Sequence, residues 1–230
     1  MSSAHPLIRM LSAFEARVRE LTEVLGDASY EPSPERALAA PWIEAHAHAL
    51  RAEAARRIWF AVPVPLAAFL EPGNRMAILA PDALRRLLAA RALFACRDAV
   101  RRCVDRRVRG ALAESVGPDA LGALAAVPAT RGAADHVLPE DVSPDALARD
   151  GWRALASIGA CGHPSLRNLI ELSLAVASDA AQQATGFARL STHGGDVCAP
   201  GQAASESKTE MTRFFSAAGG IFPELQWLFG

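Results

Sequence analysis

The stretch LRRLLAARALFACRDAVRRCVDRRVRGAL, residues 84–112, decides the fold class. Just before it, Pro81 and Asp82 mark a helix start, because proline fits the first helical turn and an acid favours the positive end of the helix dipole. At about 100° per residue, the apolar side chains of its second half gather on one face. This face holds Cys96, Val100, Cys103, Val104 and Val108. We therefore predict a helix from Pro81 to about Ser115, either continuous or with one break.

Composition extends this prediction to the whole chain of 230 residues. Alanine, the best helix former and a poor strand former, occupies 49 positions. The hydrophobic fraction of 51% and the charged fraction of 21% are typical of a globular protein that buries a core. We expect an all-α protein with one irregular multi-helix domain of about seven to nine helices.

Proline, glycine and apolar spacing place the other helices. Ser143, Pro144 and Asp145 form a clear helix start, with a side-chain cap, a proline and an acid in succession. The remaining predicted helices cover residues 7–25, 41–60, 144–158 and 164–183, with a short helix after Pro118.

Residues 185–207 interrupt this helical pattern. They lack periodic apolar residues and are rich in glycine, serine and alanine, which predicts a flexible insertion or linker. The expected organisation is a helical domain of residues 1–184, this linker, and a C-terminal helix with an apolar segment in residues 208–230 that docks on the same domain.

The C-terminal segment carries a dense group of large apolar side chains. They are Phe222, Leu225, Trp227, Leu228 and Phe229. Burying one such side chain contributes roughly 1.5–3 kcal/mol, so the group should not remain in water. It either closes as a clasp over the protein's own helices or inserts as a peg into a partner. We favour the clasp, and on that interpretation Trp227→Ala lowers stability by a few kcal/mol.

Charge and hydropathy indicate the cellular location of the protein and the class of its partners. The net charge is -1, which argues against nucleic acid as the partner of the whole chain. The mean hydropathy of +0.13 is mildly apolar, but no run of about 18 uncharged apolar residues appears. The N-terminus has no secretory signal pattern. We expect a cytoplasmic protein without direct membrane insertion.

Catalytic and metal motifs are weak. The sequence has no P-loop, GxGxxG, GxSxG or HExxH motif, so we expect neither an enzyme nor a cofactor. The alternative is a small cytoplasmic enzyme or zinc-binding protein that uses Cys161, His163, His193 and Cys198. Two thiols and two imidazoles can form a tetrahedral zinc site, but their spacing fits no zinc finger or ribbon.

Arginine gathers between residues 97 and 109. Part of this group lies on the solvent side of the predicted helix, where a pair such as Asp105–Arg109 can form. Arg97 and Arg107 fall within the apolar sector and Arg101 on its edge, so they either extend to water or pair with distant acids. The acids considered are Glu114, Asp119 and Glu140. A protein-binding surface is the second interpretation, and a helical nucleic-acid-binding regulator is the third.

Three segments in fixed order carry a family resemblance. Residues 84–112 form a leucine-rich helix that contains the run AVRRCV, residues 99–104. Residues 151–175, GWRALASIGACGHPSLRNLIELSLA, look like a glycine-aromatic helix followed by a turn and another helix. Residues 214–230, FFSAAGGIFPELQWLFG, match a short helix, a proline and a terminal leucine-phenylalanine pattern. Together they resemble the K-type cytoplasmic protein of bacterial type III secretion systems, the SctK, YscK and PscK family.

This resemblance implies a non-enzymatic adaptor peripheral to the inner-membrane face of the secretion apparatus. K-type proteins of the sorting platform link the cytoplasmic domain of the inner-membrane ring protein (SctD-like) to the Q-type pod protein (SctQ-like). The pods connect in turn to the L-type stalk and the ATPase. In this chain we predict partner binding by Arg97, Arg101, Arg102, Arg106, Trp227, Leu228 and Phe229.

Overall fold

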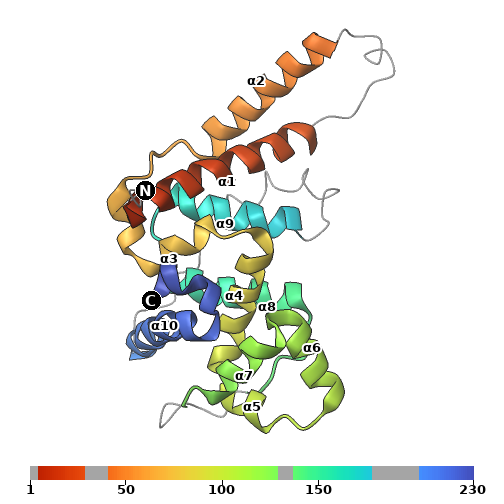
Figure 1. Ribbon diagram of the computed structural model, residues 1–230, viewed down its shortest axis with the longest axis vertical. Coiled ribbons are helices and arrows are strands. Elements are labelled where there is room, and N and C mark those ends of the chain that lie inside the picture. The colour runs from red at the N-terminus through yellow and green to blue at the C-terminus, as the bar shows by residue number, and fades with distance from the viewer. Residues whose placement is uncertain (1–4, 29–40, 129–136, 178–201) are drawn as a thin grey trace. The chain divides into compact units, whose positions relative to one another are not determined.

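The computed structural model describes residues 5–28, 41–128, 137–177 and 202–230. These residues contain eleven α-helices, three short 3-10 helices and no strand (Figure 1). The prediction of an all-α fold is confirmed, with slightly more helices than expected. The excess arises because the long predicted helix is broken into three and because two helices have only four residues.

The chain divides into two compact units. One comprises residues 1–78 and 162–197, and the other comprises residues 79–161 and 198–230. The helical domain predicted for residues 1–184 therefore spans parts of both units, and its predicted end lies outside the described residues. Each unit has its own helices.

The first unit is built around α1 (Pro6–Ala28), which packs against α2 (Pro41–Trp59) and α9 (Pro164–Ala177). Helix α1 buries Met10, Phe14, Val18 and Leu21, whose spacing of three and four places them on one face. The short helices η1 (Leu66–Leu70), α3 (Pro72–Arg75) and η2 (Met76–Ile78) complete the unit. The ring of Phe14 lies 6.5 Å from that of Phe69.

Polar side chains of α9 hold the connection that follows α2. The Ser165 hydroxyl donates a hydrogen bond to the carbonyl oxygen of Val62 at 2.6 Å, and the Asn168 amide donates one to that of Trp59 at 2.7 Å. These bonds fix a segment that has no regular secondary structure after residue 59.

The second unit is organised by α4 (Pro81–Ala95), most of whose residues from Leu84 to Phe94 are buried. Its main neighbour is α8 (Pro144–Ser157), and the two helices cross very closely at Gly151. A Cβ atom built on Gly151 would lie 1.9 Å from the carbonyl oxygen of Leu88. The absence of a side chain at Gly151 is therefore a requirement of the helix crossing.

The predicted helix from residue 81 to 115 breaks twice. Helix α4 ends at Ala95, α5 covers Arg97–Arg102, and α6 covers Arg106–Val116. At the second break the backbone is extended at Cys103 and Asp105. The Asp105 carboxylate accepts hydrogen bonds from the backbone N–H groups of Arg107 and Val108, which makes Asp105 the N-cap of α6. No ion pair joins Asp105 to Arg109, contrary to our expectation.

The C-terminal part of the second unit contains α10 (Gln202–Ile221), η5 (Pro223–Leu225) and α11 (Gln226–Phe229), and α10 packs against α7 (Pro118–Ala126) and α4. Residues 202–207, which we expected to end the linker, have helical backbone, while residues 185–201 lie outside the described part of the chain.

The apolar C-terminal group is mostly buried in this unit. Phe222, Leu225, Leu228 and Phe229 are buried, and the Phe229 ring stacks on that of Phe215 at 5.6 Å. Trp227 differs, since 45% of its surface is exposed. The predicted loss of a few kcal/mol of stability in Trp227→Ala is therefore too large. Removal of a half-exposed ring leaves only a small cavity, so it lowers the free energy of unfolding less.

Candidate protein-interaction site

The arginines of α5 and α6 form an exposed basic surface at the turn between the two helices. We define the arginine corner as residues 101–109. Its arginines are all exposed, and they are Arg101, Arg102, Arg106, Arg107 and Arg109. Only Asp98, just before the corner, and Asp105, within it, oppose them, which leaves a local net charge of +3.

Most of this charge lacks an internal counterion. Arg101 forms an ion pair with Asp98 at 2.7 Å. Asp105 uses one carboxylate oxygen to cap α6. The side chains of Arg106, Arg107 and Arg109 form no hydrogen bond or ion pair with any residue that the structure describes. The corner therefore presents several guanidinium groups to solvent.

The position of Arg106 and Arg107 is unfavourable for the helix that carries them. They occupy the first two positions of α6, which has no acidic residue in its first turn. The helix N-terminus carries partial positive charge, so cations there destabilise it by a few tenths of a kcal/mol or more each. Helix stability alone would favour acids at these positions.

An apolar side chain lies at the centre of the corner. Val104 is 94% exposed, in the connection between α5 and α6. Helical periodicity placed Val104 on the buried face, and this prediction is wrong because the break at residues 103–105 turns its side chain outward. A cap residue preceding a helix start, Asp105 before Arg106, was the sequence signal that could have located the break.

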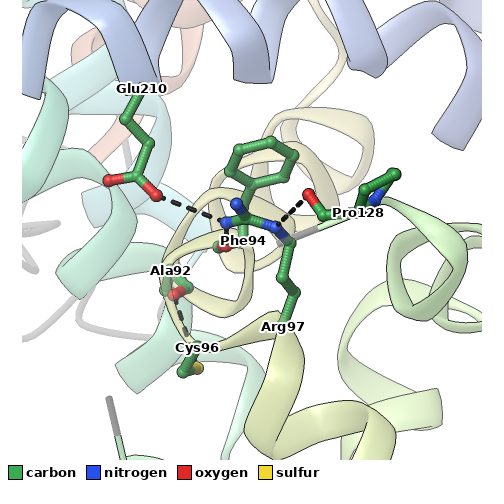
Figure 2. Close-up of polar contacts among 6 residues, drawn as sticks. All are labelled: Ala92, Phe94, Cys96, Arg97, Pro128 and Glu210. Atoms are coloured by element: carbon green, nitrogen blue, oxygen red, sulfur yellow. Dashed lines mark hydrogen bonds and ion pairs between the residues drawn. The ribbon is translucent and has the colours of Figure 1, made fainter. Parts of the chain in front are cut away.

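Arg97 lies apart from the corner and inside the second unit. It is only 3% exposed, and its guanidinium stacks over the Phe94 ring at 4.6 Å (Figure 2). Its Nε donates to the carbonyl oxygen of Pro128 at 3.2 Å, and its Nη1 lies 3.4 Å from Oε1 of Glu210. Arg97 thus connects the start of α5 with α10 and with the segment after α7. Because its side chain is buried, the structure does not support the prediction that Arg97 binds a partner.

The acid that pairs with Arg97 differs from those we considered. We named Glu114, Asp119 and Glu140, but the partner is Glu210 on α10. More than one hundred residues separate the two side chains in the sequence, and only the packing of α10 on this unit brings them together.

The other predicted partner-binding residues likewise include both exposed and buried side chains. Arg101, Arg102 and Arg106 are exposed, as a docking surface requires. Leu228 and Phe229 are buried and offer no surface to a partner. Trp227 is exposed enough to contribute to one, and it also interacts within the protein.

The candidate zinc ligands are not assembled in the described residues. Cys161 is buried, and Nε2 of His163 lies 3.1 Å from the carbonyl oxygen of Pro63. Across the described ranges, no three histidine, cysteine or acidic side chains form a group that could hold a metal ion. His193 and Cys198 lie outside these ranges, so the zinc alternative stays a prediction.

A nucleic-acid site at the corner finds little support in its side chains. Phe94 is the nearest aromatic residue in the sequence, and it is buried beneath Arg97. The corner itself therefore has no ring on which a base could stack.

Comparison with known proteins gives the family. A family model described as bacterial type III secretion protein (HrpB4) matches residues 2–199. The chain belongs to the HrpB4 family. No curated protein and no solved structure matches it. Membership of the HrpB4 family makes the chain a protein of bacterial type III secretion and agrees with its resemblance to K-type proteins. Among the described residues, no helix of this HrpB4-family protein has the length and apolar character to span a membrane.

Proposed function

We propose that this protein is a non-enzymatic adaptor of a bacterial type III secretion system. It joins the cytoplasmic domain of the inner-membrane ring protein to the Q-type pod protein, and through the pods it connects to the L-type stalk and the ATPase. The family match and the order of the three K-type segments support this proposal. The protein acts in the cytoplasm, at the inner-membrane face of the secretion apparatus.

The arginine corner is the surface that carries the proposal. Its net positive charge and the exposed Val104 suit an acidic partner surface with an apolar centre. Charged groups of this kind steer association and fix orientation. The unfavourable placement of Arg106 and Arg107 at a helix N-terminus is explained if these side chains serve binding rather than stability.

Charge reversal at the corner tests the proposal. In Arg106→Glu/Arg107→Glu the new acids suit the helix N-terminus, so the melting temperature should stay unchanged or rise slightly. Binding to the pod protein or to the ring protein's cytoplasmic domain should weaken at least about tenfold. Biolayer interferometry at two salt concentrations measures both the affinity and its electrostatic part.

The matched control is Arg56→Glu/Arg57→Glu, which reverses another exposed arginine pair, at the end of α2. This control should bind both partners as the unchanged protein does. If neither partner binds the unchanged protein, the adaptor proposal fails. If the corner variant binds as tightly as the control, the corner is not the docking surface.

A further inference from the structure

The segment that runs from the end of α2 through η1 is apolar throughout. Residues 58–70, IWFAVPVPLAAFL, contain no charged, hydroxyl or amide side chain. We define them as the apolar ledge. Such a composition is typical of a buried segment, yet four large side chains of the ledge are between 41% and 71% exposed. They recur at every fourth residue and are Ile58, Val62, Leu66 and Leu70.

The ledge is anchored to the first unit from its inner side. Phe69 is fully buried, and its ring and that of Phe60 each lie 6.5 Å from the ring of Phe14 on α1. Between these two anchors, two prolines restrict the backbone. The exposed side chains therefore project from a segment that is held in place.

Polar side chains of the same unit bind the backbone of the ledge. The donors are Ser165 and Asn168 on α9 and Asn74 and Arg75 on α3. Their hydrogen bonds measure 2.6–2.9 Å, and the carbonyl oxygens that accept them are those of Trp59, Val62, Ala68, Phe69 and Leu70. The two prolines have no backbone N–H group that needs an acceptor.

This arrangement suits an apolar environment. In water, solvent can donate to an exposed carbonyl oxygen, so the protein needs no side chain for that purpose. In lipid, backbone polar groups must find their partners inside the protein. The ledge meets this condition at five carbonyl groups while it presents large apolar side chains outward.

The residues in and around the ledge favour lipid over protein as its partner. A protein interface carries about one hydrogen bond per 100–200 Å², and the ledge has few groups that could form them. Exposed Arg56 and Arg57 directly precede the ledge, and Arg57 also pairs with Glu53 at 2.9 Å. Residues 51–75 carry four arginines against two glutamates, a net charge of +2, and guanidinium groups bind phosphate well. Trp59 is partly exposed at the start of the ledge, and tryptophan is enriched at membrane surfaces.

We propose that the apolar ledge docks this protein on the surface of a phospholipid bilayer. Ile58, Val62, Leu66 and Leu70 enter the headgroup region, and the neighbouring arginines bind lipid phosphates. The contact is peripheral and is made by a connecting segment rather than by a spanning helix. It goes beyond the adaptor function and depends neither on the pod protein nor on the ring protein.

Co-sedimentation with vesicles of phosphatidylethanolamine and phosphatidylglycerol tests the docking. The unchanged protein should bind these vesicles. Ile58→Gln/Leu70→Gln makes the two most exposed of the four side chains polar, and it should weaken vesicle binding at least about tenfold. Its melting temperature should change little, because both side chains are mostly exposed.

The matched control is Val24→Gln/Leu50→Gln. Both residues are exposed and apolar, and they lie in the same unit outside the ledge. This control should bind vesicles as the unchanged protein does. Arg106→Glu/Arg107→Glu measures the part of the binding to anionic lipid that the arginine corner contributes.

Leu70→Trp gives a second readout that does not require a loss of binding. Addition of vesicles should shift its tryptophan emission to shorter wavelength, and by more than in the unchanged protein, because the added indole enters the headgroup region.

The proposal is supported if Ile58→Gln/Leu70→Gln binds vesicles more weakly than the control does. It is overturned if the unchanged protein does not bind vesicles, or if the ledge variant and the control bind equally. If the ledge variant melts several degrees lower, Leu70→Trp decides, and an emission spectrum that vesicles do not alter overturns the proposal. If the ledge variant instead loses the pod or ring protein and vesicles do not bind, the ledge is a protein-docking surface and the lipid proposal is wrong. Binding of the pod and ring proteins without lipid tests the adaptor function separately.

Discussion

Gly151→Ala tests the close crossing of α4 and α8. A Cβ atom at this position would lie 1.9 Å from the carbonyl oxygen of Leu88 and 2.7 Å from its carbonyl carbon. Close carbon–oxygen contacts in proteins begin near about 3.3 Å, so the two helices would have to separate by more than about 1 Å. The atoms in conflict belong to the backbone of α4 and cannot rotate aside as a side chain could.

Two opposing terms set the size of the effect. Alanine favours the helix over glycine by about 1 kcal/mol. Overpacking a close-packed core costs about 1–3 kcal/mol, and a backbone clash of this depth belongs at the upper end. Separation of the helices would also loosen the buried contacts of Leu88, Leu147 and Leu155. We expect a net loss of about 2 kcal/mol, which lowers the melting temperature by roughly 4–8 °C in a chain of this size.

Thermal unfolding followed by circular dichroism measures this loss. The control is Gly122→Ala in α7, another helical glycine, whose Cβ atom would meet nothing within 4 Å. That variant should gain up to about 1 kcal/mol from helix propensity alone. If Gly151→Ala melts at or above the temperature of the unchanged protein while Gly122→Ala behaves as expected, the helices do not cross as described and the reasoning is refuted.

Two further predictions concern single side chains of the second unit. Trp227→Ala should cost about 1 kcal/mol or less because Trp227 is half exposed, whereas Leu228→Ala should cost about 2–5 kcal/mol because Leu228 is fully buried. Urea unfolding measures both values, and similar losses of unfolding free energy in the two variants would contradict this prediction. Burial raises the pKa of the Cys96 thiol to about 11, so iodoacetamide at pH 8 should modify Cys103, which is partly exposed, before Cys96. The stability that depends on the neutral Cys96 thiol is present below about pH 9 and is lost as the pH rises through 11. A Cys96→Ala variant should lack this loss, and an equal alkaline loss in both proteins would exclude Cys96 as its cause.

Local signals predicted the helix starts well. Pro81 and Pro144 each begin a helix as expected, because proline and a following acid suit the first turn of any helix, whatever it packs against. The breaks after Ala95 and Arg102 were harder to locate. The apolar spacing continues across both, and periodicity alone cannot distinguish a continuous helix from two helices joined by a short turn.

The candidate site was predictable only in part. The arginine group was visible in the sequence, but its division into buried and exposed members depends on where the helix turns and on which helix covers it. Arg97 is buried because α10 supplies Glu210 from a distant part of the chain. Arg91 of α4 is buried with its guanidinium 5.8 Å from the centre of the Phe214 ring, and the sequence gave no signal of this, because the surroundings of Arg91 depend on the packing of α10.

The division of the chain into two discontinuous units has a consequence for synthesis on the ribosome. The first unit takes α9 from beyond residue 162, so α1 is complete long before the helix that covers part of it has been made. At about 5–20 residues per second, the ribosome needs roughly 7–27 s to pass from the end of α1 to the start of α9. Arg17 of α1, whose Nη2 donates a hydrogen bond to the Ser173 hydroxyl on α9 at 3.3 Å, would lack that partner throughout this interval. The second unit waits likewise for α10, so a fragment that ends near residue 161 would leave both units unfinished.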